Sequence, residues 1–359
     1  MDIVLTDQIS APVLPEDRPG DQLERSIAAS PDRFRILTGD RPTGALHLGH
    51  YFGTLANRVR LQDVGVETFV IIADYQVIAD RDTAGDIRGN VYEILADQLA
   101  AGIDPERTTV FVHSAVPALN QLMLPFLSLV SVPELQRNPT VKAEAQAAGQ
   151  RTLGGLMLTY PVHQAADILF CHGNLVPVGR DQLAHLEVAR LIARRFNNRY
   201  SPGERFFPEP EALVGSAPVL LGTDGAKMSK SRGNAIELRA SADETARLIR
   251  RAKTDSERAV TYEPHRRLEV ANLLLLAALC QGRSPETIAE EIGGAGSGRL
   301  KTVVTESINE YFAPLRRRRT ELAADRSHLR SVLAAGNTRA NAIAETTLDR
   351  VREVMGMTY

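Results

Sequence analysis

The sequence of 359 residues contains no tryptophan, only two cysteines and few aromatic residues of any kind. Cys171 and Cys280 lie far apart, without a CxxC or Cys/His spacing, so neither a disulfide framework nor a structural zinc site is indicated. No run of about 18 apolar residues appears, and the N-terminus lacks a basic-then-apolar export pattern. The sequence therefore predicts a cytoplasmic protein in a reducing compartment, with no membrane partner and no metal site.

The sequence also lacks an excess of charge of one sign, because its formal net charge is −2. Such a molecule does not attract nucleic acid as a whole, so any contact with nucleic acid must come from a local basic patch. With 43% hydrophobic and 24% charged residues, the chain has the composition of a globular protein. Its length is sufficient for two domains.

Strand and helix patterns alternate from Phe34 onward. Short apolar runs over 34–39, 68–74 and 108–113 predict buried strands, and a helical pattern covers 87–101. Strands separated by helices predict an α/β fold with a parallel, doubly wound sheet, whose ligand lies beyond the carboxyl ends of the strands. Residues 1–32 contain four prolines and no sustained period, so we expect a loosely ordered extension there.

The stretch FRILTGDRPTGALHLGHYFG, residues 34–53, predicts a strand, a tight turn and a helix. His47 and His50 share one face of that helix, and Gly49 between them has no side chain to keep a flat ring away. Amide groups at a helix N-terminus attract anions, and imidazoles donate hydrogen bonds to phosphate or ribose oxygens. The pattern favours nucleotide binding; the alternative is two surface histidines on an ordinary helix.

A second segment carries charge suited to phosphate. Residues 225–233, GAKMSKSRG, form a glycine-flanked loop with two lysines and two serine hydroxyls. Lysine is a flexible point charge that can follow a polyphosphate as the reaction proceeds. Taken alone, the loop has an alternative interpretation as a solvated basic turn.

PTGALHLGH and KMSKS together resemble the two signatures of class I aminoacyl-tRNA synthetases, in the same order. The stretch YPVHQAADILFCHGNLVPVGRDQLAHLEVAR, residues 160–190, resembles the amino-acid-binding region of the tryptophanyl and tyrosyl branch, and its AADIL and VPVG-DQ portions resemble the tryptophanyl enzymes. The resemblance implies a Rossmann-like, HUP-type catalytic domain over 33–222, a KMSKS loop over 223–240 and a helical anticodon-binding domain over 241–359. It further implies that a helical insertion over 114–160 contributes to a homodimer interface, although the apolar run 122–130 is equally compatible with internal packing.

The resemblance implies an enzyme that activates L-tryptophan with ATP, accompanied by Mg²⁺, and transfers it to tRNA(Trp). No side-chain nucleophile is needed, because phosphoryl chemistry of this kind depends on positioning and charge stabilisation. The residues carried over as catalytic are Thr43, His47, His50, Lys227 and Lys230. Those carried over as ATP-binding are Arg41, Gly49, His50, Lys142, Gly179, Asp181, Gln182, Lys227, Met228, Ser229 and Lys230.

Tyr160, Gln164 and Asp167 are spaced i, i+4 and i+7, so they share one face of a predicted helix. Buried polar groups need hydrogen-bond partners, either a ligand or a polar network between helices. An indole offers one donor and no acceptor, which suits a lone carboxylate, and Asp167 occupies the place of the indole-binding aspartate of the family. The other residues that the resemblance assigns to tryptophan are Leu37, Gly39, Gln76, Val176 and Val178.

Several positions depart from the tryptophanyl pattern and leave alternatives open. Gln164 also fits tyrosyl-tRNA synthetases, although Leu37 stands where those enzymes carry tyrosine. Arg41 and Gln76 replace a glutamine and a histidine of the pocket rim, from which we hypothesise altered sensitivity to tryptophan-like inhibitors. A non-charging regulatory or nucleotide-binding paralogue is an alternative of another class, yet HLGH and KMSKS are both intact. The absence of tryptophan would suit an auxiliary isoform made when tryptophan is scarce.

Overall fold

The computed structural model describes residues 21–79, 85–142, 153–179, 182–214 and 219–359. The chain divides into two compact units that do not follow the order of the sequence. The sheet unit comprises 20–46, 53–216 and 318–359, whereas the KMSKS unit comprises His47–Phe52 together with Ala217–Arg317. In the described ranges, no helix is long and apolar enough to cross a membrane.

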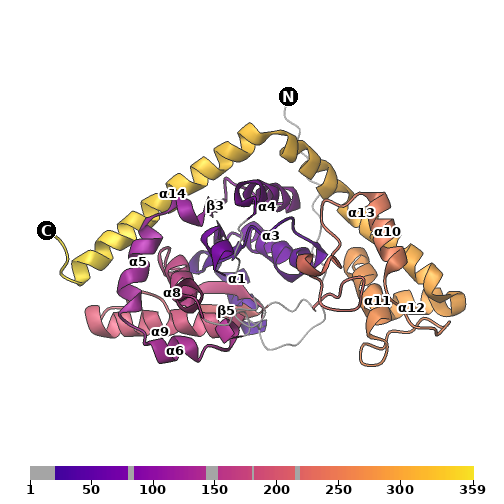
Figure 1. Cartoon of the computed structure of the whole chain (residues 1–359), viewed down its shortest axis with the longest axis horizontal. Helices are drawn as coiled ribbons and strands as arrows, with labels where there is room; N and C mark the ends of the chain where they lie inside the picture. The colour runs from indigo at the N-terminus through magenta and orange to yellow at the C-terminus, as the bar shows by residue number, and fades with distance from the viewer. Residues whose placement is uncertain (1–20, 80–84, 143–152, 180–181, 215–218) are drawn as a thin grey trace. The chain divides into compact units, whose positions relative to one another are not determined.

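In the described residues, the sheet unit contains five parallel strands in the order β3-β2-β1-β4-β5, of which Figure 1 labels β3 and β5. Their bounds are β1 Arg35–Asp40, β2 Glu67–Ile72, β3 Thr108–Val112, β4 Leu175–Val178 and β5 Glu211–Val214. The chain builds outward from β1 to β3 and then returns to the other side of β1. The predicted doubly wound parallel sheet is therefore confirmed, and the three strands expected from sequence lie within a residue or two of their predicted bounds.

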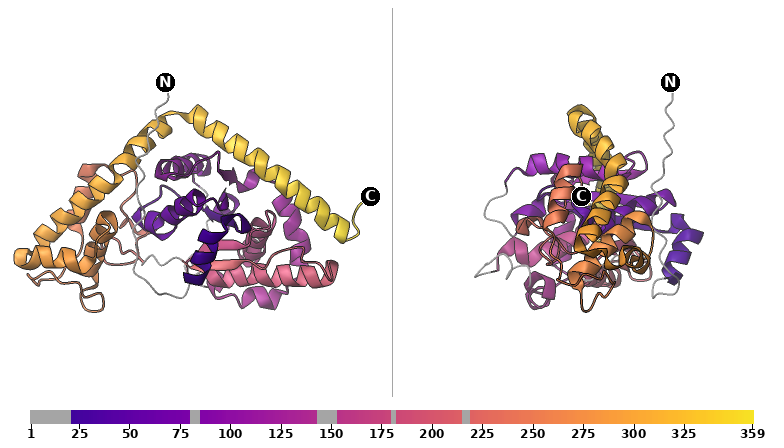
Figure 2. Two further views of the ribbon diagram at one scale, coloured as in Figure 1. Left: turned by 180° about the vertical axis from the view of Figure 1, so that it is seen from behind. Right: turned by 90° about the vertical axis from the view of Figure 1, so that its right-hand side faces the viewer.

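Successive residues of a strand point to opposite faces, and the two faces of this sheet have different covers. Ile36 packs with Leu61 of α3 (Ala56–Asp63) and Ile27 of α1 (Asp21–Ala29) on one face. Leu37 and Phe69 pack on the other face, in one core cluster with residues of four helices. Figure 1 labels these helices, and Figure 2 shows the same ribbon from two further sides. These helices are α5 Ala118–Leu127, α8 Gly155–Leu169, α9 Leu183–Tyr200 and α14 Arg326–Val354. The remaining helices of this unit include α4 Ile87–Ala101 and α6 Val132–Gln136.

Helix α1 corrects the expectation of a loosely ordered extension over residues 1–32. Residues 21–29 are helical, and η1 Pro31–Arg33 follows directly. Ile27 is buried against Ile36 and Leu175, so burial of apolar surface stabilises this helix despite the polar, proline-containing sequence around it. Residues 1–20 lie outside the described part of the chain.

Helix α14 belongs to the sheet unit, which corrects the prediction of one helical domain over 241–359. The Asn337 carboxamide oxygen accepts a hydrogen bond from the Val112 amide at 3.0 Å, and the Asn341 carboxamide donates to the Ala115 carbonyl at 2.8 Å. A Cβ atom on Gly336 would lie 1.7 Å from the Val110 carbonyl oxygen. Because glycine allows this close approach, α14 lies directly on the backbone of β3.

The KMSKS unit is mainly helical, with α10 Ala242–Arg251, α11 Leu268–Gln281, α12 Pro285–Ile292 and most of α13 Gly296–Ala324. It also holds α2 Leu48–His50, so the predicted boundary of 33–222 for the catalytic domain is wrong at this point. The rings of Tyr51 and Phe312 are 4.9 Å apart, and the hydroxyls of Tyr51 and Tyr311 are 3.2 Å apart. These aromatic contacts attach the HLGH segment to α13.

Candidate active site

The HLGH segment is held in a defined local geometry. His47 is the N-cap residue of α2, and its amide donates to Nδ1 of His50 at 3.2 Å. Since Nδ1 of His50 accepts, the neutral His50 ring carries its proton on Nε2. The two rings lie 3.7 Å apart, and a Cβ on Gly49 would lie 3.0 Å from the His47 ring. Glycine at position 49 therefore leaves room for both imidazoles.

HLGH packs directly against the segment that carries KMSKS. The Leu48 amide donates to the Ile236 carbonyl at 3.0 Å, and His47 pairs with Glu237 in an antiparallel bridge. A Cβ on Gly49 would be 3.8 Å from Cβ of Met228, which is buried. The two signatures, almost two hundred residues apart in sequence, thus form one site within the KMSKS unit.

Asn234 determines the shape of the KMSKS loop. Its side-chain oxygen accepts from the Ser229 amide at 2.8 Å, while its NH₂ group donates to Asp224 at 2.7 Å and to the Lys227 carbonyl at 3.2 Å. The left-handed φ angles of Gly225 (83°) and Gly233 (65°) bound the loop. Lys227 is exposed and Lys230 is half-buried, so the loop presents ammonium groups while its backbone is held.

The electrostatics of this site favour a neutral His47. Burial, together with the smaller effects of the neighbouring His50 and Lys230, lowers the pKa of His47 to about 3. His47 is therefore uncharged near neutral pH, and the positive charge comes from the two lysines. Nδ1 of His47 is buried and has no hydrogen-bond partner among the described residues. A buried nitrogen of this kind is a ready partner for a bound molecule.

The polar stripe predicted on one helix lies on α8 in the sheet unit. Asp167 is 1% exposed, and burial raises the pKa of its carboxyl group well above the ordinary value. Oδ1 of Asp167 lies 3.2 Å from Nε2 of His113, without the alignment of a hydrogen bond. Tyr160 is buried, with its hydroxyl bonded to Nε2 of His185, and Gln164 is half-buried between the two ends of the stripe.

The other residues assigned to tryptophan lie close to this helix or at the strand ends. Leu37, Val176 and Val178 belong to the core cluster that also contains the apolar residues of the C-terminal half of α8, from Val162 to Leu169. A Cβ on Gly39 would lie 2.4 Å from the Ile71 carbonyl oxygen, which requires glycine there. Gln76 is half-buried in η3 (Tyr75–Ile78). Three of the residues assigned to tryptophan are therefore buried apolar side chains of the same core cluster.

The remaining residues assigned to ATP lie in the sheet unit. Arg41 and Thr43 are half-buried and follow β1, with the Thr43 amide donating to the Arg41 carbonyl at 2.8 Å. Gly179 follows β4 and accepts from the Gln182 amide at 3.0 Å. Lys142 is exposed, whereas Asp181 lies outside the described residues. The structure therefore brings the HLGH and KMSKS residues together in the KMSKS unit, whereas these other residues belong to the sheet unit.

Sequence reasoning missed two histidines next to Asp167. His113 follows β3, and its side chain is completely buried. His163 lies on α8, and its ring is 4.0 Å from that of His113. The two histidines and Asp167 each offer a ligand atom within 4.8 Å of the others, a donor set that a metal ion could use and that cysteine spacing did not indicate. The i, i+4 spacing of His163 and Asp167 was a signal that could have found the pair.

A third missed residue is Asp97 of α4, which is fully buried. Its carboxylate accepts from the Leu46 amide at 2.8 Å and from Nε of Arg319 at 2.9 Å. Leu46 immediately precedes His47, so Asp97 anchors the chain at the entrance to HLGH. Burial raises the pKa of Asp97, although the Leu46 amide and Arg319 act in the opposite direction.

The basic run 316–319 is largely committed to contacts inside the chain. Arg316 donates to Asn309 and Thr245, Arg318 donates to the Ala100 carbonyl, and Arg319 pairs with Asp97. Arg317 is exposed. Structural pairing therefore accounts for three of these four arginines.

Comparison with known proteins identifies the family to which the chain belongs. The model of the class I tRNA synthetases (W and Y) matches residues 30–313. Tryptophan–tRNA ligases from Treponema pallidum and Clostridium longisporum are each 40% identical to this chain over 90% of its length and 97% of their own.

Solved structures agree. The tryptophanyl-tRNA synthetase of Campylobacter jejuni complexed with ADP and tryptophan has a TM-score of 0.77 at 32% identity, covering 90% of this chain and all of that one. A tyrosyl-tRNA synthetase from Archaeoglobus fulgidus, at 23% identity and a TM-score of 0.66, shares the fold. The parallel sheet and the packing of HLGH against the KMSKS segment agree with these similarities. The chain therefore belongs to the tryptophanyl and tyrosyl family of class I aminoacyl-tRNA synthetases.

Proposed function

We propose that this chain is a tryptophan–tRNA ligase, which activates L-tryptophan with Mg·ATP and transfers it to tRNA(Trp). The contact between HLGH and KMSKS carries the proposal, because the hydrogen bond from Leu48 to Ile236 holds two phosphate-handling segments together. The tryptophan–tRNA ligases that resemble the chain at about 40% identity support the same substrate.

The site supplies position and charge for the first step. A carboxylate oxygen of tryptophan attacks the α-phosphorus of ATP, and the bond to pyrophosphate breaks. We assign His47 and His50 to the nucleotide. The Nδ1 of His47 has no partner among the described residues, and His50 carries its proton on Nε2. The ammonium groups of Lys227 and Lys230 neutralise the negative charge that accumulates on the departing pyrophosphate.

The HLGH and KMSKS residues themselves offer imidazoles, ammonium groups and hydroxyls, whereas Mg²⁺ in a protein is usually bound by carboxylates. The two carboxylates nearby are already bonded inside the chain, Asp224 to Asn234 and Glu237 to Arg239. The ion therefore enters as part of the Mg·ATP substrate, carried by phosphate oxygens and water. Arg41, Thr43, Lys142, Gly179, Asp181 and Gln182 are assigned to the nucleotide by resemblance alone. In the second step, a ribose hydroxyl of the tRNA terminus attacks the carbonyl carbon of the adenylate and AMP leaves.

Recognition of tryptophan is assigned to the buried carboxylate of α8. Asp167 offers an acceptor for the single N–H of indole, and Leu37, Val176 and Val178 offer apolar surface for the rings. A phenol would need both a donor and an acceptor. The buried, apolar Leu37 gives it neither. Tyrosine is thus the less favoured substrate.

The decisive experiment is ATP–pyrophosphate exchange with each of the twenty amino acids, followed by charging of tRNA(Trp). We expect exchange with tryptophan alone, at rates at least a hundred times those with tyrosine or phenylalanine, on the order expected when a buried acceptor is left unpaired. Exchange driven by tyrosine would establish the tyrosyl alternative. Exchange with none of the twenty would indicate a non-charging paralogue.

The assembly we propose is a homodimer formed through residues 114–160. Leu124 of α5 is 73% exposed and Val132 of α6 is 55% exposed, although both are apolar. Sedimentation velocity should give a dimer for the wild type and a monomer for Leu124→Glu. Leu268→Glu, at an equally apolar position that is 51% exposed in the KMSKS unit, is the matched control and should remain dimeric. A monomeric wild type would refute this assembly. We assign the protein to the cytoplasm, where its tRNA substrate is found.

A further inference from the structure

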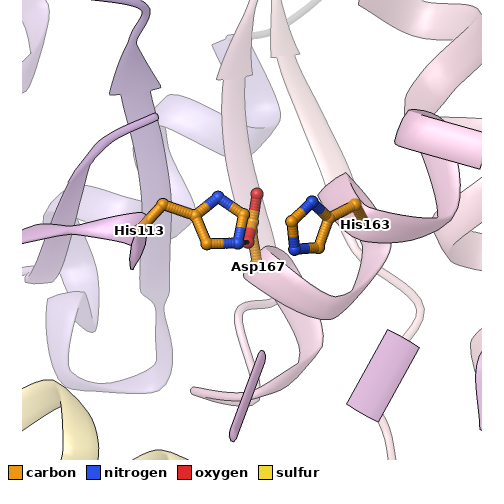
Figure 3. A group of neighbouring side chains, drawn as sticks. All are labelled: His113, His163 and Asp167. Atoms are coloured by element: carbon orange, nitrogen blue, oxygen red, sulfur yellow. Dashed lines mark ion pairs between the residues drawn. The ribbon is translucent and has the colours of Figure 1, made fainter. Parts of the chain in front are cut away.

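Two histidines enclose the carboxylate assigned to indole. Figure 3 shows His113, which follows β3, facing Asp167 of α8, with His163 of the same helix on the other side. The side chains are 0%, 4% and 1% exposed for His113, His163 and Asp167. The two imidazoles lie 4.0 Å apart, and Nε2 of His113 is 3.2 Å from Oδ1 of Asp167. Such a cluster must satisfy its hydrogen bonds internally or with a ligand.

His163 already has its partner. Its Nε2 lies 2.8 Å from the carboxamide oxygen of Asn120 on α5, which can only accept. His163 therefore carries its proton on Nε2. Burial lowers the pKa of His163 to about 4, so this ring is neutral at pH 7. It contributes a flat, uncharged wall beside His113.

His113 and Asp167, in contrast, leave polar atoms unpaired. Both ring nitrogens of His113 and Oδ1 of Asp167 are buried without a hydrogen bond to any described residue. A buried donor or acceptor that is left unpaired destabilises the folded chain. Because Nε2 and Oδ1 are already within 3.2 Å, a rotation of the ring would align them and satisfy one donor and one acceptor at once.

We infer that His113 is a positioning residue for the amino acid substrate: its Nε2–H donates to Oδ1 of Asp167 and holds the carboxylate as an acceptor for the ring N–H of tryptophan. The inference deepens the proposed function and rests on it. His113 makes no contact with the reacting atoms and acts only through Asp167.

The surroundings of the pair explain why such a donor is needed. Burial raises the pKa of Asp167 well above its ordinary value, and it lowers the pKa of His113 well below its own, with a further lowering from the neighbouring His163. Without a donor, a carboxylate at this depth would take up a proton. Among the described residues, the rings of His163 on α8 and Tyr75 on η3 lie 4.0 Å and 5.4 Å from the ring of His113. Neither supplies a compensating positive charge.

The test compares tryptophan with its isostere β-(3-benzothienyl)alanine, in which sulfur replaces the ring N–H. Pyrophosphate exchange is measured on the full chain for the wild type, His113→Leu and His113→Gln. We expect His113→Leu to raise KM for tryptophan roughly tenfold, the effect of losing one charge-assisted hydrogen bond, and to leave KM for the isostere unchanged. His113→Gln keeps an N–H donor and should retain the preference for tryptophan. His328→Gln, at an exposed histidine of α14, is the matched control.

Three results would overturn the inference. Equal losses of kcat/KM for both amino acids in His113→Leu would mean that His113 only fills space. Loss of the preference in His113→Gln as well would mean that a donor is not what matters. Stoichiometric zinc in the purified protein, removed by a chelator together with tryptophan binding, would make the cluster a metal centre. The wild type is assayed first. If it does not activate tryptophan at all, the proposed function is refuted before any variant is tested.

Discussion

Replacement of Asp97 by asparagine should destabilise the sheet unit by about 3 kcal/mol. Asp97 is fully buried, and Arg319, its partner at 2.9 Å, has a side chain only 12% exposed. Removing one partner of a buried pair costs roughly 3–5 kcal/mol because the other charge is left uncompensated. The lower end applies here, since Arg319 keeps its second partner Glu93.

The measurement is urea unfolding at pH 7, with Asp63→Asn as the matched control. Asp63 pairs with Arg107 at 3.1 Å, but both side chains are about half exposed, so the same change should cost less than about 1 kcal/mol. A double-mutant cycle with Arg319→Gln should show coupling between positions 97 and 319. Wild-type stability in Asp97→Asn would refute the reasoning, because it would mean that the desolvation of the carboxylate cancels the attraction of the pair.

Asp97 also links stability to activity. Asparagine can still accept the Leu46 amide through its carboxamide oxygen, whereas alanine cannot. Asp97→Ala should therefore raise KM for ATP in pyrophosphate exchange as well as lower stability, because Leu46 precedes His47. The Asp97→Asn variant should lose stability with less effect on KM.

Three further predictions concern glycine, lysine and acid. Gly336→Ala should destabilise the chain by about 1–3 kcal/mol, because the new Cβ would meet the Val110 oxygen at 1.7 Å. The control is Gly298→Ala on α13, where nothing lies within 4 Å of the new Cβ, and it should be neutral or slightly stabilising. Equal denaturant midpoints for the two variants would contradict this contrast. Lys230→Ala should slow adenylate formation far more than it weakens tryptophan binding in equilibrium dialysis; equal losses in both would argue against a role at pyrophosphate. The pKa of His163 is lowered to about 4 by burial, below its ordinary value of 6.5, so the unfolded chain binds the proton first and stability declines as the pH falls from about 6.5 towards 4. Between pH 7 and pH 5, wild type should accordingly lose about 2 kcal/mol more than His163→Gln. Parallel pH profiles would contradict this, because they would mean that His163 has the same pKa in the folded and the unfolded chain.

The sheet and the two signatures could be predicted because they depend on local patterns. Apolar runs of strand length bounded by turns specified β1, β2 and β3, and the order of strands and helices specified parallel pairing. The spacing of Tyr160, Gln164 and Asp167 placed them on one helix, as the structure confirms. These features require no knowledge of distant contacts.

What could not be predicted depends on contacts between residues far apart in the sequence. The sequence predicts His113 as the last residue of a strand, but only the packing of α8 against the sheet brings it to Asp167. The arginines of 316–319 have the pattern of a solvated helix face, yet Arg319 reaches a carboxylate more than two hundred residues away. The grouping of His47–Phe52 with residues 217–317 similarly follows from long-range pairing and aromatic packing.

The position of α14 has a consequence for how the chain is made. β3 is an outer strand of the sheet, and an uncovered outer strand can pair with a strand of another molecule. Its cover comes from residues around 336–341, which leave the ribosome long after β3 itself. During synthesis the sheet therefore assembles with β3 uncovered. A prematurely terminated product would keep this strand exposed, so that it could pair with strands of other molecules. Cells that express such fragments should show them in aggregates rather than as inactive, dissolved enzyme.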